Sequence, residues 1–591
     1  MVVVTATRSP VPLAETTGDV SVIDAAQIAA AGQSTLLELL RTLPGVEVSS
    51  QGGPGQPATV FLRGANSNHT VVLIDGVRQT SLNLGLGSLQ SLPLAAVERV
   101  EVLRAPASGL YGADAVGGVI QVFTKAASGG NGVSVGVGDY GRRRADVNLA
   151  GNVDGLRWGV SVGEDRSSGF DAVLPSNFAH HPDHDAHKQQ ALQASLAKDF
   201  GEQLGLSLKW LSASNRTGID AEFPPYSSAP NARSKQDISN LALVVTSRLH
   251  KNWLSTLQLG ENRDTFRWQD TLSFDDRIEN TTKLVSWQND LDFGAHRLRL
   301  GVENQRQDVR AEATAYGQHE RTTRSVLAGY QVASDGHTLR ADLRQDRIAG
   351  YGDVNSGNLG YSLRLAPQWV ADVRWGKAFK LPTFNDLYYV DPWGYFVPNA
   401  KLTPETGRTL EAGLIHQTAK TRVGLHAFSS RIEDLIINYD ADGFMGPQPG
   451  TVINAGLAKI HGLTADVHMT LAAWALRGAL TWQDARDATT DQRLPRRARV
   501  HGSLIAERNY GVWHAGVELL AQGTRFDSLP NSAAGELAGY AVTNLRVAYV
   551  PNQTWSVQAR WNNVFDKTYA LAQGYPTPGS NVFVDLRFAL P

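Results

Sequence analysis

The sequence predicts a transmembrane β-barrel of about 22 antiparallel strands with an N-terminal α/β plug domain in its lumen. Two observations predict this architecture. Residues 1–127 have the mixed pattern of a small α/β unit, whereas residues 128–591 alternate between polar and apolar side chains with a period of two. No apolar run approaches the roughly 20 residues of a membrane-spanning helix. Each membrane strand therefore carries its apolar character on one face only.

Composition narrows the class of protein. At 591 residues, the chain exceeds one ordinary globular core. Its 55 basic residues nearly balance its 57 acidic ones, which gives no case for nucleic-acid binding. The absence of cysteine suits an oxidising compartment. Met1 leads directly into valines without a signal peptide. Composition thus leaves open a cytoplasmic chain or a mature form whose signal has been removed.

The N-terminal unit combines one clear helix with short strands. Thr35 and Glu38 have the spacing of a capping box, the leucines that follow continue an apolar helical face, and 43–45 (Leu-Pro-Gly) ends it. Short apolar runs predict strands at 59–63, 71–74, 97–103 and 118–124. Nothing in this unit resembles a catalytic site, and the chain lacks the common nucleophile, zinc-protease and phosphate-binding motifs.

The rest of the chain alternates as membrane strands do. Leu300 and Val302 alternate with Arg299 and Glu303, and the same pattern recurs in 582–588. At about 20 residues for each strand with its turn and loop, this part holds on the order of 22 strands. A barrel of that size has a lumen wide enough for a plug. The soluble alternative, a propeller or several sandwiches, would show a blade repeat or linkers, and neither is found.

Long ordered motifs carry a resemblance to a known family. In the N-terminal unit they are FLRG (61–64), VLIDGV (72–77), VERVEVLR (97–104), SGLYG (108–112) and AVGGVI (115–120). In the second part they are KLP (380–382), PNAKLTPE (398–405) and NNVFDKTY (562–569). Over essentially its whole length the chain resembles a TonB-dependent outer-membrane receptor. The resemblance implies a monomeric importer in the outer membrane, not an enzyme, with TonB and membrane lipid as partners and a signal peptide absent from this sequence.

Within the family, the chain is most similar to receptors for vitamin B12 (cobalamin). The likeness rests on QST (33–35), LPGV (43–46), GGPGQ (52–56), NAGLAKIHG (454–462) and RRA (496–498). It implies TonB-dependent transport of cobalamin or a related corrinoid. Siderophore receptors share most of these features, so uptake of a ferric siderophore or another metal chelate is the alternative.

The valine-rich N-terminus resembles the TonB box, an extended peptide that pairs with a strand of the periplasmic TonB protein. The segment comprises Val2, Val3, Val4, Thr5 and Ala6. Strand addition draws its affinity from backbone hydrogen bonds, and β-branched residues favour the extended state. A frayed terminus is the alternative interpretation, and the position just before a plug-like unit favours the TonB box.

Acidic residues in the expected extracellular loops form a candidate calcium site. The resemblance implies loops ordered by Ca²⁺, with ligands at Asp171, Asp183, Asp185 and Asp220, while Asn231 and His181 stand at further ligand positions. Several oxygen ligands in flexible geometry suit Ca²⁺. The alternative is a set of solvated loop acids. The histidines of segment 180–187 also admit a zinc or nickel site, although histidines in a loop are more often solvated groups without a metal.

Further candidate residues concern the binding of cargo. By position, the resemblance places the substrate contacts of the plug at Gln51, Pro57, Asn66, Leu84 and Gly85. Aromatic residues flank the ligand or belong to the membrane girdles: Tyr389, Trp393, Tyr395 and Tyr575.

Two plug arginines need a buried acidic partner. Arg63 and Arg104 are expected inside the barrel, where an unpaired guanidinium is costly, and Glu411 is the expected partner. The pairing predicts either a structural anchor or a latch between plug and barrel that pulling by TonB must disturb.

Overall fold

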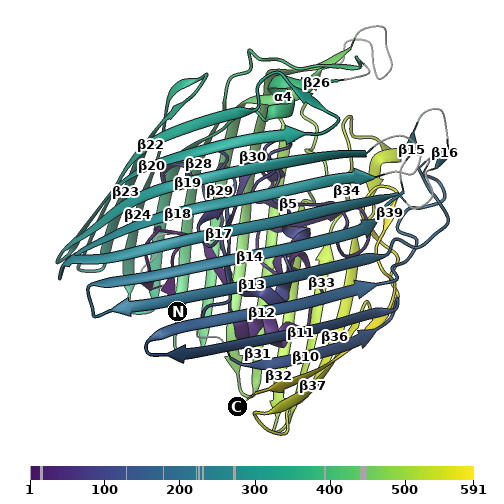
Figure 1. Ribbon diagram of the computed structural model, residues 1–591, viewed down its shortest axis with the longest axis horizontal. Coiled ribbons are helices and arrows are strands. Elements are labelled where there is room, and N and C mark those ends of the chain that lie inside the picture. Colours follow the sequence, from purple (N-terminus) through teal and green to yellow (C-terminus); the bar gives the residue numbers. More distant parts are fainter. Residues whose placement is uncertain are drawn as a thin grey trace.

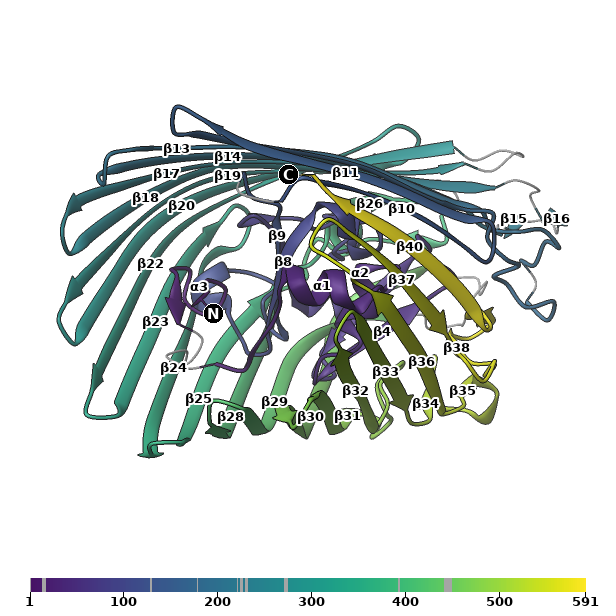
Figure 2. The same ribbon diagram turned by 90° about the horizontal axis from the view of Figure 1, so that it is seen from below.

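The structure, a computed structural model, describes residues 2–12, 18–127, 130–177, 179–220, 222–223, 227–228, 232–269, 275–391, 394–439 and 449–590. Within these residues the chain forms a closed barrel of 22 antiparallel strands around an N-terminal domain, which confirms the predicted fold class. The purple N-terminal domain lies inside the barrel in Figure 2, with α1 and α2 in the lumen. The first barrel strand pairs with the last one, which closes the wall.

The wall consists of long strands joined to their neighbours in sequence (Figure 1). Its strands are β10 (Gly132–Gly138), β11 (Arg142–Val153), β12 (Leu156–Ser167), β13 (His187–Phe200), β14 (Leu204–Gly218), β17 (Arg233–His250), β18 (Trp253–Gln269), β19 (Asp275–Phe293), β20 (His296–Ala311), β22 (Glu320–Ser334), β23 (His337–Ile348), β24 (Gly352–Ala366), β25 (Trp369–Lys380), β28 (Glu405–Gln417), β29 (Thr421–Tyr439), β30 (Gly450–Leu471), β31 (Trp474–Asp487), β32 (Val500–Tyr510), β33 (Trp513–Gln522), β36 (Tyr540–Tyr549), β37 (Trp555–Asn562) and β40 (Asn581–Ala589).

The alternation of each strand separates a lipid face from a luminal face. On β20, Leu300 is 45% exposed on the outside, whereas its neighbour Arg299 is 4% exposed and faces the lumen. An apolar outer face and a polar inner face are typical of an outer-membrane barrel. The closed wall with this polarity excludes the soluble propeller or sandwich.

The two ends of the barrel differ in the length of their connections. Turns such as 154–155, 251–252 and 294–295 are tight at one end, while long loops such as 168–186 and 381–404 lie at the other. In outer-membrane barrels the short turns face the periplasm and the long loops face outward. The short elements of the loop end are β15 (Glu222–Phe223), β16 (Ser227–Ser228), β21 (Ala315–Tyr316), α4 (Phe384–Tyr388), β26 (Tyr389–Val390), β27 (Phe396–Val397), β34 (Arg525–Phe526), η5 (Ala533–Gly535), β35 (Glu536–Leu537), β38 (Ala570–Ala572) and β39 (Tyr575–Pro576).

The N-terminal domain is built on a five-stranded sheet in the order β3-β8-β9-β6-β7. Its elements are β1 (Val2–Val3), β2 (Val11–Pro12), β3 (Val20–Ile23), α1 (Ala25–Ala31), α2 (Leu36–Leu40), β4 (Val46–Ser50), β5 (Ala58–Leu62), η2 (Ser67–His69), β6 (Thr70–Ile74), β7 (Val77–Arg78), η3 (Leu89–Ser91), η4 (Leu94–Ala96), β8 (Val97–Leu103), α3 (Ser108–Tyr111) and β9 (Gly118–Thr124). The predicted strands 97–103 and 118–124 have the observed bounds, and the other two differ by one residue.

The predicted helix start was correct, but its capping differs from a full capping box. The Thr35 side chain accepts from the backbone N–H of Glu38, as expected. The Glu38 carboxylate instead accepts from the N–H of Ser34, at 2.7 Å. The helix α1, which begins with a complete capping box between Asp24 and Gln27, was not predicted. None of the helices in the described residues has both the length and the apolar character needed to cross a bilayer.

Candidate functional site

The valine-rich N-terminal segment is folded back on itself within the lumen. Val2–Val3 pairs antiparallel with Val11–Pro12, and the chain between them turns sharply. The side chains of Val3 and Thr5 are fully buried. The segment is therefore a buried hairpin in this state, and its pairing with a second protein requires release.

The plug holds the backbone of this segment through a single carboxylate. Glu101 on β8 accepts from the N–H groups of Val4 and Thr5 at 2.9 and 2.8 Å, and from the Thr5 hydroxyl at 2.7 Å. The Tyr111 hydroxyl donates to the Thr5 carbonyl at 3.0 Å. Backbone groups that strand addition would use are thus occupied by the plug.

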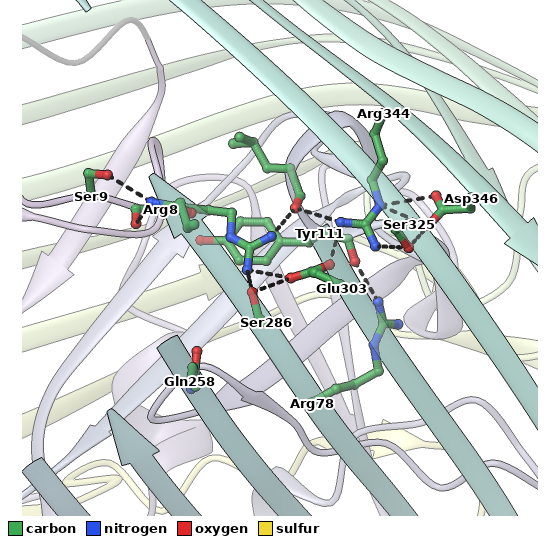
Figure 3. A network of polar contacts seen from close by, with 12 residues as sticks. Arg8, Ser9, Arg78, Tyr111, Gln258, Ser286, Glu303, Ser325, Arg344 and Asp346 are labelled. Atoms are coloured by element: carbon green, nitrogen blue, oxygen red, sulfur yellow. Dashed lines mark hydrogen bonds and ion pairs between the residues drawn. The ribbon is translucent and has the colours of Figure 1, made fainter. Parts of the chain in front are cut away.

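Arg8 ties the same segment to the barrel wall (Figure 3). Its Nη2 lies 2.5 Å from a carboxylate oxygen of Glu303 on β20, and its Nη1 donates to the Leu110 carbonyl at 2.9 Å. Arg344 on β23 binds the other oxygen of Glu303. Arg8 has a left-handed backbone with φ of 58°, a conformation that costs a non-glycine residue about 1–2 kcal/mol. The ion pair offsets this cost and fixes the turn of the hairpin.

A buried cluster of charges joins the plug to the barrel. Asp19 accepts from Arg63 Nη2 at 2.6 Å, and from Arg104 Nε and Nη2 at 2.9 and 2.5 Å. Glu411 on β28 accepts from Arg63 Nη1, and Arg374 Nη1 on β25 lies 2.9 Å from its second oxygen. We call these five residues the plug–barrel cluster. Its plug side is Asp19, Arg63 and Arg104, and its barrel side is Glu411 and Arg374.

The structure places the three residues predicted for this site together but divides their pairing. Glu411 binds Arg63, whereas Arg104 binds Asp19 instead. Burial alone would raise the pKa of Asp19, yet the neighbouring charges, Arg104 foremost, hold it well below its usual range. The carboxylate is therefore ionised and bound to both arginines. Sequence reasoning missed Asp19 because its partners lie 44 and 85 residues farther along the chain.

Three predicted calcium ligands converge in the extracellular loops. Carboxylate oxygens of Asp183, Asp185 and Asp220 all lie within 4.8 Å of one another, and we call this group the acidic cluster. Asp220 accepts from the His181 N–H at 2.8 Å and Asp185 from the Ala172 N–H at 3.0 Å. Burial, together with the charges of Asp220 and Asp183, raises the pKa of Asp185 to about 7. A bound cation would relieve this repulsion, and the donor set suits a hard cation.

Of the other predicted ligands, Asp171 and His181 lie beside the acidic cluster but are not among its three converging carboxylates. The Asp171 carboxylate lies 2.9 Å from His180 Nε2. Asn231 lies outside the described residues. His181 contributes its backbone N–H to Asp220. Among the residues that the structure describes, the histidines of segment 180–187 do not join any group of three metal-ligating side chains.

The loop that carries Gln51 and Pro57 packs against the acidic cluster. The Gln51 N–H donates to the Pro57 carbonyl at 3.0 Å and closes the loop. A β-carbon at Gly52 would lie 2.7 Å from that of Ala172, whose N–H binds the acidic cluster. A β-carbon at Gly55 would lie 2.4 Å from the ring of His187, the first residue of β13. This close approach requires glycine and couples the order of the extracellular loop to the top of the plug.

The other candidate substrate contacts occupy two further plug loops. Asn66 begins the turn η2, and its side chain accepts from Arg497 in the loop before β32. Leu84 is 52% exposed on its plug loop. Its neighbour Gly85 has φ of 74° and a backbone N–H bound to Ser81. These loops present one apolar and several uncharged polar groups.

The candidate aromatic residues lie in the loops beyond the wall strands. Tyr389 packs on Tyr316, with ring centroids 6.3 Å apart, where β26 pairs with β21. Tyr395 is exposed and Tyr575 lies in β39. Trp393 lies outside the described residues. The three described rings thus belong to the loop end and not to the wall strands that would carry a membrane girdle.

Comparison with known families covers almost the entire chain. Residues 12–119 match the TonB-dependent receptor plug domain. Residues 124–564 match the family described as TonB-dependent receptor-like β-barrel. Together, these matches include the plug–barrel cluster and the acidic cluster.

Relatives and solved structures agree on the architecture. The vitamin B12 transporter BtuB of Vibrio vulnificus is 29% identical over 99% of this chain and 95% of its own length. BtuB of Photobacterium profundum is 27% identical over 97% of this chain and 93% of its own. The siderophore receptor PirA from Acinetobacter baumannii superposes with a TM-score of 0.84 at 17% identity, covering 97% of this chain and 98% of PirA. At that identity the superposition shows the fold alone.

Proposed function

The chain belongs to the TonB-dependent receptors, and from this premise we propose that it imports vitamin B12 (cobalamin) or a related corrinoid across the bacterial outer membrane. The family consists of outer-membrane receptors and transporters and not of enzymes. The observation that carries the proposal is the likeness to vitamin B12 transporters along nearly the full length of the chain. The solved structures that resemble it are mostly siderophore receptors, but at identities too low to bear on cargo.

The chemistry of the loop end supports a neutral cargo. A corrinoid is large, neutral overall and ringed with amides, so uncharged polar and apolar contacts suit it. The candidate contacts include Gln51, Asn66 and Leu84, none of which is charged. Uptake of a ferric siderophore or other chelate is the second candidate function.

Equilibrium binding should identify the cargo. We expect the purified receptor to bind cyanocobalamin and to show no measurable affinity for a panel of ferric siderophores at the same concentrations. Intrinsic tryptophan fluorescence with competition between ligands would measure both. Leu84→Asp, which introduces a charge on the exposed plug loop, should weaken cyanocobalamin binding by roughly tenfold, since a charge without a partner must be desolvated. Tight binding of a siderophore without binding of cyanocobalamin would favour the second function.

Energy coupling in this proposal acts on the buried hairpin. TonB would add a strand to the segment Val2–Ala6 after Glu101 releases the backbone N–H groups of Val4 and Thr5, which strand addition needs. The ion pair between Arg8 and Glu303, which holds the hairpin against the wall, must also break. The hairpin lies in the lumen while the candidate substrate contacts lie at the loop end. Cargo binding and energy input therefore act on opposite ends of the plug.

We also propose that Ca²⁺ orders the extracellular loops at the acidic cluster. Calorimetric titration should detect Ca²⁺ binding at or below millimolar concentration. Asp183→Asn should reduce the affinity by roughly tenfold or more, because one anionic ligand in a small set is lost. The matched control is Asp335→Asn, which removes one exposed carboxylate from the tight turn between β22 and β23, at the other end of the barrel. No heat of Ca²⁺ binding at millimolar concentration would reject the site.

A further inference from the structure

Basic side chains form a continuous row across the outside of the barrel at its loop end. Seven consecutive strands, β11 to β19, each contribute one basic residue, and each residue is the direct cross-strand partner of the next. The row comprises Arg143, Arg166, Lys188, Arg216, Lys235, Arg267 and Arg277. These strands lie side by side on the near wall in Figure 1. Their luminal neighbours, such as Asn215 and Thr217 beside Arg216, are buried, so the basic side chains point outward.

Such a row is unfavourable on its own. Directly opposed side chains in an antiparallel pair have β-carbons about 4.5–5.5 Å apart, and like charges at this spacing destabilise the sheet. In the first four strands of the row, compensation is sparse. Among the described residues Lys188 has one ion pair, with Glu164 at 3.3 Å, while Arg143, Arg166 and Arg216 have none. The four adjacent cations thus lack sufficient counter-charge from the protein.

Several other exposed cations at this end are paired with carboxylates. Arg306 lies 2.5 Å from Glu320, and Arg347 lies 2.8 Å from Asp353. A shorter row across β25 to β31 contains Lys377, Arg408, Arg431, Lys459 and Arg486. In this row Arg408 and Arg431 share Glu433, and Arg486 binds Asp484. The shortage of counter-charge is greatest on β11 to β14.

The row lies just above the lipid belt on these strands. Four residues along each strand toward the tight-turn end, the outward side chains are apolar. Val147 follows Arg143 on β11, Val162 precedes Arg166 on β12, and Leu192 follows Lys188 on β13. All three are exposed apolar residues, and Val162 is 50% exposed. Four residues of a strand span about 13 Å, and tilt shortens this distance along the membrane normal. The cations therefore lie at the level of the lipid head groups in the outer leaflet.

We propose that Arg143, Arg166, Lys188 and Arg216 bind the phosphate groups of an outer-leaflet lipid. Guanidinium groups bind phosphate through paired, charge-assisted hydrogen bonds, which suits arginine at three of the four positions. Neighbouring strands lie about 4.8 Å apart, so two or more cations reach one phosphate and the row accommodates a head group with several phosphates. The acyl chains of the same lipid lie against the exposed apolar residues below. The lipid supplies the counter-charge that the protein lacks.

Native mass spectrometry of the full-length receptor in detergent tests this site. The probes are lipid A, whose disaccharide carries two phosphates, its monophosphoryl form, and zwitterionic phosphatidylethanolamine. The variant Arg143→Gln/Arg166→Gln/Arg216→Gln should bind lipid A on the order of 100-fold more weakly, since each basic residue near an anionic lipid contributes about fivefold. The control Arg306→Gln/Arg310→Gln/Arg347→Gln removes the same charge from carboxylate-paired arginines and should bind lipid A like the wild type.

Three results would overturn the proposal. Equal losses in both triple variants would show attraction by net charge alone. Equal binding of lipid A and phosphatidylethanolamine would show that phosphate charge is not recognised, and displacement of lipid A by millimolar inorganic phosphate would favour a free anion. Thermal unfolding in lipid-free detergent is an independent readout. The Arg143/Arg166/Arg216 variant should be at least as stable as the wild type there, because it relieves repulsion, whereas a marked loss of stability would assign the row a structural role.

Discussion

Deleting Val2–Ala6 is expected to abolish energised uptake while leaving equilibrium binding of the cargo within about twofold of the wild type. The physical reason is the separation of the two functions within the plug. The deleted residues supply the strand that TonB would pair with. The candidate substrate contacts lie on plug loops at the other end of the lumen. Uptake of labelled cyanocobalamin by cells, with binding measured on the same cells, would record both quantities.

Arg8→Gln is the matched control for this deletion. It breaks the ion pair with Glu303 but keeps every residue of the valine-rich segment. The hairpin should then be released more readily, so uptake should persist and a protease should cleave the N-terminus faster than in the wild type. Normal uptake by the deletion variant would refute the assignment of the segment. Loss of cargo binding in that variant would show instead that the hairpin supports the whole plug.

Glu411→Gln is expected to lower the stability of the plug–barrel assembly by about 3–5 kcal/mol. The substitution leaves Arg63 and Arg374 buried with one carboxylate fewer. Arg63 then shares Asp19 with Arg104. Among the described residues, Arg374 keeps only its ion pair with Asp372. Removing one member of a buried ion pair costs more than the net value of the pair, because the partner charge stays desolvated. Denaturant unfolding in detergent, followed by exposure of the plug to protease, would measure the loss.

Glu433→Gln is the control for the plug–barrel cluster. Glu433 is also a barrel glutamate with two arginine partners, but its ion pairs are partly exposed on the outer face. Such pairs contribute about 0–1 kcal/mol, so this variant should unfold close to the wild type. If Glu411→Gln changes neither plug stability nor transport, the cluster is neither anchor nor latch. A change in stability without a change in transport would leave the anchor and remove the latch.

The geometry of the cluster supports a latch that is loaded from the N-terminus. Among the described residues, Arg8 is the first along the chain with an ion pair to the barrel, and Asp19 is the next residue of the plug that joins such a cluster. Force applied at Val2–Ala6 would therefore reach Arg8 first and Asp19 second. Uptake by Arg8→Gln and by Glu411→Gln would show which of the two contacts limits transport.

Much of the fold could be predicted from local patterns. Alternation with period two marked the strands because lipid lies on one side only, and capping residues placed the start of α2 within one residue. The helix α1 was missed although Asp24 and Gln27 cap it, because its alanine-rich face buries no complete side chain and shows no apolar stripe. The motifs of the plug identified the family because they are long, ordered and correctly spaced.

The sequence by itself determined the barrel, the plug and the family, since each rests on residues that are close together in the chain. That the N-terminal segment is a hairpin buried in the lumen was decided only by the tertiary structure. Only the tertiary structure decided which charges meet. Asp19 reaches Arg63 and Arg104 through folding of the plug, and the acidic cluster excludes the Asp171 carboxylate because that group is held by His180. The row of seven basic residues exists only because strand register aligns them across loops of unequal length. Register is a property of paired strands, so no single strand of the sequence contains it.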